Sequence, residues 1–378
     1  MSFNDNEEQQ LFAASIARFV ERDCTFENRR KSIASPEGYS EKMWKTMAEL
    51  GLLGLPVPRE YGGFGGGATE TMVVMEAIGS ALIVEPFLAT VGLGARFIAR
   101  AGTAEQMQRI LPAVADGTTK LAFAHTETSA RYDLAHVATR ARRTDDGGFL
   151  IDGEKRVVVH AASADALIVS ARTGGDVTSP EGIELFIVDS RTPGIARRDY
   201  RTLDAMRAAD VLFSGVRVPA GARLGDGSAG LTLIEEVVDY ATALVCAEAI
   251  GAIRYANDAT LEYLKTRQQF GVPIGTFQAL QHRMVDMVIE CEQAKSMAYL
   301  ACRTVDSETD PIARRHAVSA AKVRIADACR LVSQEAVQLH GGMGMSDEVK
   351  VSHTFRRLTI IAQQFGDADH HLDRFART

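Results

Sequence analysis

Three hydrophobic patterns follow one another along the chain. Over residues 6–117, apolar positions recur at helical spacing between glycine or proline stops. Over residues 120–219, the pattern changes to short apolar or alternating runs that are bounded by turn residues. After Gly227, helical spacing returns in longer segments. This order predicts a helical domain, a small β domain and a helical bundle.

The helical spacing is clearest in three segments. They contain, in chain order, Leu11, Ser15, Ile16, Phe19 and Val20; Leu280, Met284, Met287, Val288 and Cys291; and Val318, Ala321, Ile325 and Ala328. Residues three or four positions apart share one helix face, so each set would bury one apolar stripe. We therefore predict an N-terminal α-helical domain at 1–119 and a C-terminal helical bundle domain at 221–378.

The middle segment, 120–220, is predicted to be a β domain. Its expected strands are 121–124, 149–151, 157–159, 166–169, 184–188 and 211–213. Turns are expected at Asp146-Gly-Gly and Thr173-Gly-Gly-Asp, because glycine favours tight chain reversals. The fold class is thus α+β multidomain, and a length of 378 residues also exceeds a single ordinary core.

Composition and charge act mainly by excluding functions. Apolar residues at 46% and charged residues at 24% are typical of a soluble globular protein. The net charge of -7 argues against a nucleic-acid partner, because neutralising phosphates takes a clustered basic surplus. The nearest basic cluster, Arg140, Arg142 and Arg143, is interpreted as a solvated strand edge.

No apolar run is long enough to cross a membrane, and the N-terminus carries Asp5, Glu7 and Glu8 instead of a basic and then apolar leader. We therefore expect a cytoplasmic protein without membrane contact. The five cysteines are an odd number and include no C-x-x-C pair. They predict buried free thiols and not a disulfide framework or a zinc site.

Three formal motif matches are interpreted as structural. Residues 63–68 read G-x-G-x-x-A, but prolines break the preceding segment and no parallel βαβ pattern follows, so a glycine-rich turn into a helix is enough. Residues 319–322 match S-x-x-K inside a helical run without partner motifs. Residues 367–373 include types that bind metals, but neighbours on a helix point apart, which favours a polar C-terminal helix.

The stretch from Arg267 to Gln278 carries the most informative chemistry. It reads Arg-Gln-Gln-Phe-Gly-Val-Pro-Ile-Gly-Thr-Phe-Gln and lies between two helical segments. Arg267 offers a fork of donors to a pyrophosphate, and Phe270 offers a stacking face. Gly271 and Pro273 break the helix between them. The stretch predicts a cradle for the phosphates and the flat ring of a nucleotide.

This stretch and Gln338-Leu-His-Gly-Gly342 resemble the C-terminal flavin-contact motifs of the acyl-CoA dehydrogenase family. Further matches to the family follow in order over nearly the whole chain. They are Leu50-Gly-Leu-Leu-Gly-Leu-Pro-Val-Pro, Tyr61-Gly-Gly, Gln106-Met-Gln-Arg-Ile-Leu-Pro112 with Gly117, Thr126-Glu127, Asp152-Gly-Glu-Lys155, Val218-Pro219 and Met343-Gly344. So many ordered matches make the assignment specific.

The resemblance implies the acyl-CoA dehydrogenase fold, with an N-terminal α domain, a middle β domain and a C-terminal four-helix bundle, assembled as a tetramer of two dimers. It also implies FAD, whose flavin ring lies in the β domain of one subunit and whose ADP half reaches a neighbour. In the family, the neighbour supplies the positions matched here by Arg267, Phe270, Gln278, Gln338, Gly341 and Gly342. Thr126 belongs to the motif on the flavin-ring side.

The family reaction needs a base that this chain lacks. In the family, a glutamate removes the α proton of an acyl-CoA while a hydride leaves the β carbon for the flavin. Such a proton is weakly acidic, so the base needs a dry pocket and a raised pKa. An ungapped count from Gln338 places the family's glutamate at Phe365. The alternative position, counted back from Arg267, is Ala241. Neither side chain accepts a proton.

The motifs on the flavin-ring side are also altered. The family's Thr-Glu-Pro-Gly-x-Gly-Ser-Asp becomes Thr126-Glu-Thr-Ser-Ala-Arg-Tyr-Asp133, in which Arg131 and other bulky residues replace glycines that approach the ligand. The family's Trp-Ile followed by Thr or Ser becomes Val157-Val-Val159. Residues toward a neighbour's ADP are therefore intact, whereas those toward this chain's own flavin ring are not.

This asymmetry favours the small, base-lacking subunit of a bacterial heteromeric acyl-CoA dehydrogenase, which resembles the pimeloyl-CoA dehydrogenase small-subunit type. Some bacterial members of the family are two-gene assemblies in which one chain lacks the base. The expected partners are an acyl-CoA substrate, a homologous subunit or a second copy of this chain, and an electron-transfer flavoprotein. Two alternatives stay open: a self-sufficient dehydrogenase or oxidase with Asp367 or Asp239 as base, and a non-enzymatic binding or scaffold protein.

Overall fold

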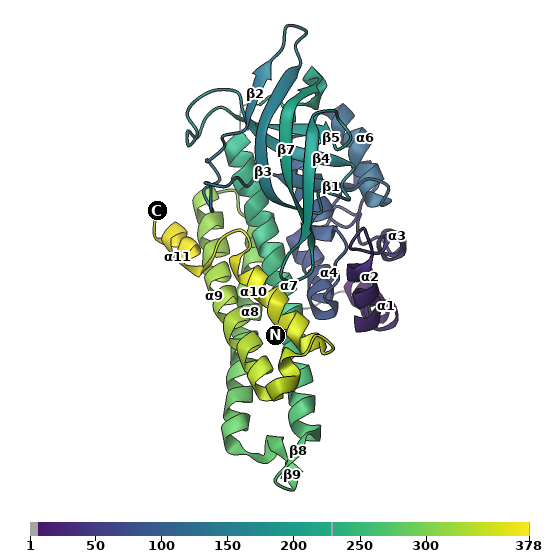
Figure 1. Ribbon diagram of the computed structural model, residues 1–378, viewed down its shortest axis with the longest axis vertical. Helices are drawn as coiled ribbons and strands as arrows, with labels where there is room; N and C mark the ends of the chain where they lie inside the picture. The colour runs from purple at the N-terminus through teal and green to yellow at the C-terminus, as the bar shows by residue number, and fades with distance from the viewer. Residues whose placement is uncertain (1–6, 228–229, 378) are drawn as a thin grey trace. The chain divides into compact units, whose positions relative to one another are not determined.

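The computed structural model describes residues 7–227 and 230–377 (Figure 1). The segment with helical spacing at the N-terminal end forms helices, as predicted. They are α1 (Glu7–Asp23), α2 (Phe26–Ala34), α3 (Glu41–Glu49), η1 (Arg59–Tyr61), α4 (Ala68–Ala81), the π-helix η2 (Leu88–Ala95), α5 (Arg96–Ala101) and α6 (Ala104–Ala115). The glycine-rich segment before α4 is a loop that leads into a helix, as expected.

The middle segment forms one curled sheet of seven strands (Figure 1). The strands are β1 (Leu121–Ala124), β2 (Arg140–Arg143), β3 (Phe149–Val159), β4 (Ala166–Arg172), β5 (Ile183–Asp189), β6 (Ile195–Arg201) and β7 (Arg207–Val218). Their order is β1-β4-β2-β3-β7-β6, and β5 pairs with β4. The core of the sheet is built from inward-facing residues such as Ile151, Val169 and Phe186, which are fully buried.

Two of these strands escaped the hydrophobic pattern. β6 reads Ile-Ala-Arg-Arg-Asp-Tyr-Arg and is mostly exposed at the edge of the sheet, so it shows no apolar run. β2 is also mostly charged, and only Ala141 is buried. β2 pairs with β3 along its length and with β4 at Arg140, so it lies inside the sheet. Its arginines nevertheless face solvent.

The C-terminal segment contains the long helices that the spacing predicted. They are α7 (Gly230–Thr266), α8 (Gln278–Ser307), α9 (Pro311–His340), α10 (Lys350–Gln363) and α11 (Ala368–Ala376). α9 begins where Asp310 accepts hydrogen bonds from the backbone of Ile312 and Ala313, with Pro311 in the first turn. Both features favour a helix start. The S-x-x-K match lies inside α9, and the polar segment after residue 367 is α11.

The described residues divide into two compact units. The helical unit combines residues of 1–32, 68–84 and 242–378, and the sheet unit combines residues of 33–67 and 85–241. The cysteines Cys24, Cys246, Cys291, Cys302 and Cys329 are all buried free thiols, as expected. No group of His, Cys, Asp and Glu suited to a metal ion occurs in the described part of the chain. None of the described helices is long and apolar enough to cross a membrane.

The helical unit depends on a close approach between α4 and α7. A Cβ atom added to Gly79 would lie 1.9 Å from the backbone oxygen of Glu248, and one added to Gly251 would lie 1.8 Å from that of Glu76. The Glu248 carboxylate also accepts two bonds from the guanidinium of buried Arg357 on α10, at 2.6 and 2.7 Å. The two helices therefore meet backbone to backbone.

We predict that Gly251→Val destabilises the chain strongly. The new side chain has to displace backbone atoms of α4, which we expect to cost about 3 kcal/mol or more. Urea unfolding measures the change. Gly221→Ala is the matched control, because a Cβ at Gly221 meets no atom within 4 Å and its unfolding midpoint should stay unchanged. Equal midpoints for the two variants would contradict the prediction.

Candidate functional site

The predicted cofactor residues lie in both units. Thr126 belongs to the sheet unit, and the other predicted residues belong to the helical unit. Each group is described by itself. A third segment, around Phe365, is where the sequence count placed the family's base, and it also belongs to the helical unit.

Arg267 and Phe270 stand on a short hairpin between α7 and α8. The backbone N–H of Arg267 donates to Tyr263 O at 2.8 Å, and its carbonyl accepts from Ile274 N at 2.8 Å. Strands β8 (Gln268–Gln269) and β9 (Val272–Pro273) pair between these bonds (Figure 1). Phe270 and Gly271, with φ of 55° and 80°, make the tight turn that a two-residue hairpin loop requires.

The hairpin presents its side chains to solvent. The Phe270 ring is 91% exposed, and it meets the edge of Phe277 at a centroid distance of 6.1 Å. The Arg267 side chain is exposed, and within residues 7–227 and 230–377 its guanidinium has no hydrogen-bond or ion-pair partner. Gln278 follows Phe277 as the first residue of α8 and is exposed as well.

The glycine turn after α9 lies at the same end of the bundle. α9 ends at His340, and the short helix η5 (Gly341–Met345) follows. Gly341 has φ of 59° and ψ of -141°, and its N–H donates to Gln338 O. A Cβ added to Gly341 or Gly342 would meet no atom within 4 Å, so the backbone here is open to a ligand.

A ring stack joins the two segments. The Tyr263 ring, one turn before Arg267, lies 4.5 Å from the imidazole of His340 at an interplanar angle of 25°. His340 is buried and its Nδ1 lies 2.8 Å from Ala336 O. Burial lowers the pKa of His340, although the bond to Ala336 opposes this shift. The stack therefore brings the hairpin and the glycine turn together, as a shared ligand would need.

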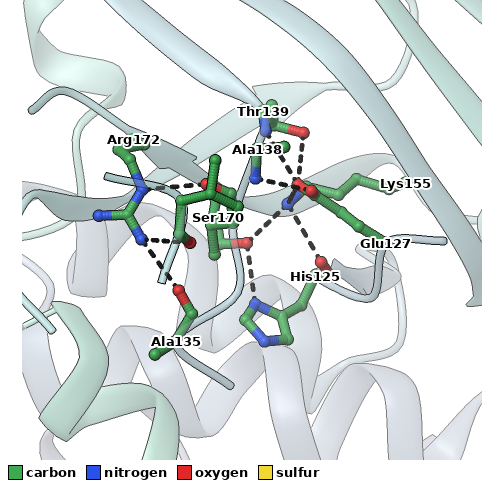
Figure 2. Close-up of polar contacts among 10 residues, drawn as sticks. His125, Glu127, Ala135, Ala138, Thr139, Lys155, Ser170 and Arg172 are labelled. Carbon is green, nitrogen blue, oxygen red and sulfur yellow. Dashed lines mark hydrogen bonds and ion pairs between the residues drawn. The ribbon is translucent and has the colours of Figure 1, made fainter. Parts of the chain in front are cut away.

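Thr126 lies between two buried polar residues of the sheet unit. His125 and Glu127 point inward, and Thr126 between them is exposed. Figure 2 shows that the ammonium of Lys155 on β3 binds both neighbours: its Nζ donates to His125 O at 3.1 Å and to Glu127 Oε1 at 2.7 Å. It also donates to Ser170 Oγ at 2.9 Å. Lys155 is completely buried.

Both oxygens of the Glu127 carboxylate accept hydrogen bonds. It accepts from Ala138 N at 2.7 Å, and from the backbone N and Oγ1 of Thr139 at 3.0 and 2.7 Å. Burial by itself would raise the pKa of Glu127, but Lys155 and these donors hold it below 4.5. Burial lowers the pKa of Lys155 to about 8 despite its carboxylate partner. Burial also lowers the pKa of His125 to about 3, so this ring is neutral.

A second buried cation organises the neighbouring loops. The guanidinium of Arg172 donates to Val137 O, Ala135 O, Gly174 O, Val177 O, Ser179 O and Glu181 O (Figure 2 shows part of this set). These carbonyls lie in the loops 130–138 and 173–182. The loop that begins at Thr126 is thus held by Glu127 at its start and by Arg172 at its end.

Arg131 and Val157, which the sequence analysis identified as departures from the family motifs, lie on the surface of the sheet unit. Arg131 is exposed with φ of 47°, and Val157 is 51% exposed with φ of 52°. Val157 lies in a bulge of β3, between Lys155 and Val158. The two predicted strands at 149–151 and 157–159 are therefore one bulged strand. Thr126 O accepts from Arg156 N at 2.7 Å, which joins the loop to this bulge.

The turn at the base position is tightly held. α10 ends at Gln363, and Phe365 and Gly366 have φ of 62° and 126°. Buried Lys322 of α9 donates to Ala362 O at 3.0 Å and to Gly366 O at 2.7 Å. Nε2 of buried His371 lies 3.1 Å from Phe365 O. The Phe365 side chain is half-buried.

The two carboxylates near the base positions differ in their surroundings. Asp367 is the N-cap of α11, and its Oδ1 accepts from His370 N at 2.9 Å. Asp239 lies on α7 and is 1% exposed, two residues before fully buried Ala241. The two counted positions themselves, Phe365 and Ala241, carry no acidic side chain.

The sequence analysis did not predict the buried interactions of four of these residues. Lys155 and Glu127 were recognised only as family motif residues, and Arg172 and Lys322 were given no role as buried cations. A lysine inside an alternating strand, at an inward position, is the signal that suggests a buried pair at Lys155. No such signal identifies the acceptors, because they are mostly backbone carbonyls from distant segments.

Comparison with known proteins shows to which family the chain belongs. Three family models match in order: acyl-CoA dehydrogenase N-terminal domain at 6–118, middle domain at 122–216 and C-terminal domain at 228–378. The chain belongs to the acyl-CoA dehydrogenase family. It is therefore an FAD-dependent oxidoreductase with the acyl-CoA dehydrogenase fold.

Relatives match along the whole chain. The probable acyl-CoA dehydrogenase YngJ of Bacillus subtilis is 31% identical over 99% of this chain and 98% of its own. The caffeyl-CoA reductase-Etf complex subunit CarC of Acetobacterium woodii is 30% identical over 92% of both. Butyryl-CoA dehydrogenase from Megasphaera elsdenii has a TM-score of 0.89 at 28% identity, covering 99% and 98%. The ChsE4-ChsE5 complex from Mycobacterium tuberculosis has 0.89 at 26%, covering 100% and 98%.

The described residues suit one half of FAD better than the other. The exposed guanidinium of Arg267, the exposed Phe270 ring and the open backbone at Gly341 fit a pyrophosphate and an adenosine. On the sheet unit, Thr126 offers a hydroxyl, but Arg131 and Val157 stand where the family has glycine and an aromatic ring. The hairpin and the glycine turn of the helical unit therefore have the chemistry to hold an ADP group, whereas the surface of the sheet unit beside Thr126 offers fewer groups to a flavin ring.

We predict that Glu127→Ala destabilises the sheet unit by about 3–5 kcal/mol, because it leaves the buried ammonium of Lys155 without its counter-charge. The double variant Glu127→Leu with Lys155→Met should cost less than Glu127→Ala alone. Because the pKa of Glu127 is lowered from 4.5, the contribution of the pair is present above pH 4.5 and is lost as the pH falls further.

Urea unfolding at pH 7 measures these changes. Arg142→Ala is the control, because it breaks an exposed ion pair with Asp152 and should cost no more than about 1 kcal/mol. If Glu127→Ala costs no more than this control, the buried pair does not hold the loop.

Proposed function

We propose that this chain is the base-lacking supporting subunit of a heteromeric FAD-dependent acyl-CoA dehydrogenase. The observation that carries the proposal is the absence of a carboxylate at both base positions, where Phe365 and Ala241 stand. The α proton of an acyl-CoA is removed by a positioned general base, and a phenyl ring or a methyl group cannot accept it. The partner subunit then supplies the base.

The turn that holds Phe365 supports this proposal over a shifted base. Lys322 and His371 bind the carbonyls of this turn, so its backbone has little freedom to move another residue into place. Asp367 is engaged in capping α11, which makes it a poor proton acceptor for a substrate. The self-sufficient alternative would need the start of α11 to shift if Asp367 is the base, or α7 to turn about its axis if Asp239, which lies inside that helix, is the base.

The predicted cofactor residues support a site that is shared between two subunits. We propose that Arg267, Phe270, Gln278, Gln338, Gly341 and Gly342 hold the ADP half of an FAD whose flavin ring lies in the partner. Arg267 would bind the pyrophosphate, and Phe270 would cover a flat ring. Thr126 is proposed as the remaining contact on the flavin-ring side of this chain. When FAD is bound, it accepts the hydride of the substrate.

An exposed apolar surface on α8 is consistent with a partner subunit. Val285, Val288 and Ile289 are 56%, 46% and 47% exposed, and Phe277 at the start of the helix is 39% exposed. Helical spacing places these valines and the isoleucine close together, and such a patch on a helix commonly marks a protein interface. A homologous bundle, which presents a similar helix, is the proposed occupant.

Two solved neighbours are named as two-protein assemblies: the ChsE4-ChsE5 complex and the Tcur3481-Tcur3483 steroid ACAD, which is 29% identical with a TM-score of 0.86. CarC is named as a subunit of a complex with Etf. These names support a homologous partner subunit and an electron-transfer flavoprotein as acceptor for this chain. The substrate is proposed to be an acyl-CoA thioester.

A scaffold without a catalytic role is disfavoured by the exposed guanidinium of Arg267, which is free to bind a ligand.

The decisive test is the visible spectrum of this chain purified alone and with a co-expressed homologous subunit. We expect the lone chain to be colourless and the complex to be yellow, with half the FAD per chain of a self-sufficient member. Anaerobic addition of acyl-CoAs should bleach the complex. A lone chain that is yellow and bleaches would overturn the proposal, and Asp367→Asn and Asp239→Asn would then identify its base.

We also predict that Arg267→Ala weakens FAD retention in the complex about tenfold or more, because a charge-assisted hydrogen bond to a phosphate is lost. Equilibrium dialysis of the complex measures the dissociation constant. Arg303→Ala is the control. It removes an exposed arginine inside α8, away from the hairpin that carries Arg267, and this variant should retain FAD. If both variants retain FAD equally, Arg267 does not contact the cofactor. Tyr263→Phe should also retain it, since the ring stack on His340 survives.

A further inference from the structure

A buried contact between an arginine and a histidine joins α2 to α10. Arg29 Nη1 lies 2.8 Å from His353 Nδ1, and the two residues are 6% and 3% exposed. Both belong to the helical unit. Neither is a motif residue of the proposed cofactor site.

The partners of His353 determine which of its nitrogens carries the proton. A guanidinium only donates, so Nδ1 has to accept and is unprotonated. The other nitrogen, Nε2, lies 2.9 Å from the backbone oxygen of Asp347 and 3.3 Å from its carboxylate, so it carries the hydrogen. The contact with Arg29 therefore requires a neutral imidazole.

Arg29 makes this contact the junction of three segments. Its Nε also donates, at 2.9 Å, to the carbonyl of Leu82 just after α4. The ring of Phe26, on the same helix α2, meets the His353 ring edge-on at a centroid distance of 4.9 Å. α2, the segment after α4 and α10 thus converge on the Arg29–His353 contact, and the protonation state of the imidazole decides whether Arg29 keeps this acceptor.

We propose that the Arg29–His353 contact is a pH-sensitive latch between α2 and α10. When His353 is protonated at Nδ1, its new N–H faces the N–H of Arg29, and its positive charge faces that of the guanidinium. The contact then breaks, and α2 is released from α10. The charged groups that act on the imidazole are Arg29 on α2, Arg356 on α10 and the carboxylate of Asp347. Arg30 on α2 also acts on Asp347, and Lys350 on α10 lies within the electrostatic reach of Arg29, so cations outnumber carboxylates among these described groups. Arg356 already pairs with the Asp347 carboxylate at 2.8 Å, and Lys350 lies over the Tyr255 ring at 3.8 Å. A further positive charge therefore finds little compensation.

The direction of the pH effect follows from the same surroundings. Burial lowers the pKa of His353 below its ordinary value of 6.5, Arg29 and Arg356 lower it further, and Asp347 opposes them. Above pH 6.5 the imidazole is neutral whether the latch is closed or open, and the contact contributes its full stability. As the pH falls below this value, the open form binds the proton first, so the closed latch loses stability in acid.

Hydrogen–deuterium exchange read by mass spectrometry tests the latch in the full-length chain. After correction for intrinsic rates, we expect backbone amides of α2 and of the first turns of α10 to lose protection by up to about tenfold between pH 7.5 and pH 5.5, the limit that one proton with an open-state pKa of 6.5 allows, and to regain it on return. Amides in the middle of α8 should not change, which separates local release from general acid unfolding.

His353→Gln is the deciding variant, because an amide can accept from Arg29 and donate to Asp347 but takes no proton in this range. It should stay protected at both pH values. His125→Gln, at another buried histidine that faces no arginine, should keep the wild-type pH response. Equal acid-induced exchange in wild type and His353→Gln would overturn the proposal, as would protection of α2 in the wild type at pH 5.5.

Discussion

A buried cation has to find acceptors inside the protein, and this constraint organises both units of the chain. Leaving a desolvated ammonium or guanidinium unpaired costs several kcal/mol, so each one gathers oxygens from segments that are distant in sequence. Lys155 gathers a carboxylate, a carbonyl and a hydroxyl, and Arg172 gathers carbonyls from two loops. Lys322 does the same for the turn after α10. The loop after Thr126 and the turn at Phe365 are attached to these cations.

This arrangement separates the scaffold of the site from its chemistry. The turn around Phe365 and the loop after Thr126 keep firm internal supports, although the residues that they present differ from those of the family. A phenyl ring at residue 365 cannot accept a proton, which is the ground on which we propose that the base comes from a partner. In the heteromer that we propose, this chain would keep the fold and the ADP-binding end because it completes the site of a related partner.

The helical and sheet segments could be predicted from hydrophobic periodicity, because most of their residues bury one stripe or one face. The prediction failed where that signal was weak. β6 lies exposed at a sheet edge and β2 turns three arginines to solvent, so backbone pairing rather than side-chain burial makes them strands. The bulge at Val157 likewise merged two expected strands into one, since a bulge interrupts alternation without ending a strand.

For the candidate site, the sequence by itself determined the residue types: the cation and ring at Arg267 and Phe270, the open glycines, and the lack of a carboxylate at Phe365 and Ala241. These are local properties that need no neighbours to be read. Only the tertiary structure decided that Tyr263 stacks on His340 to unite two segments of the bundle, and that Asp367 is engaged as a helix cap. Such contacts join residues far apart in sequence or depend on where a helix starts, so their energies appear only when the chain is folded.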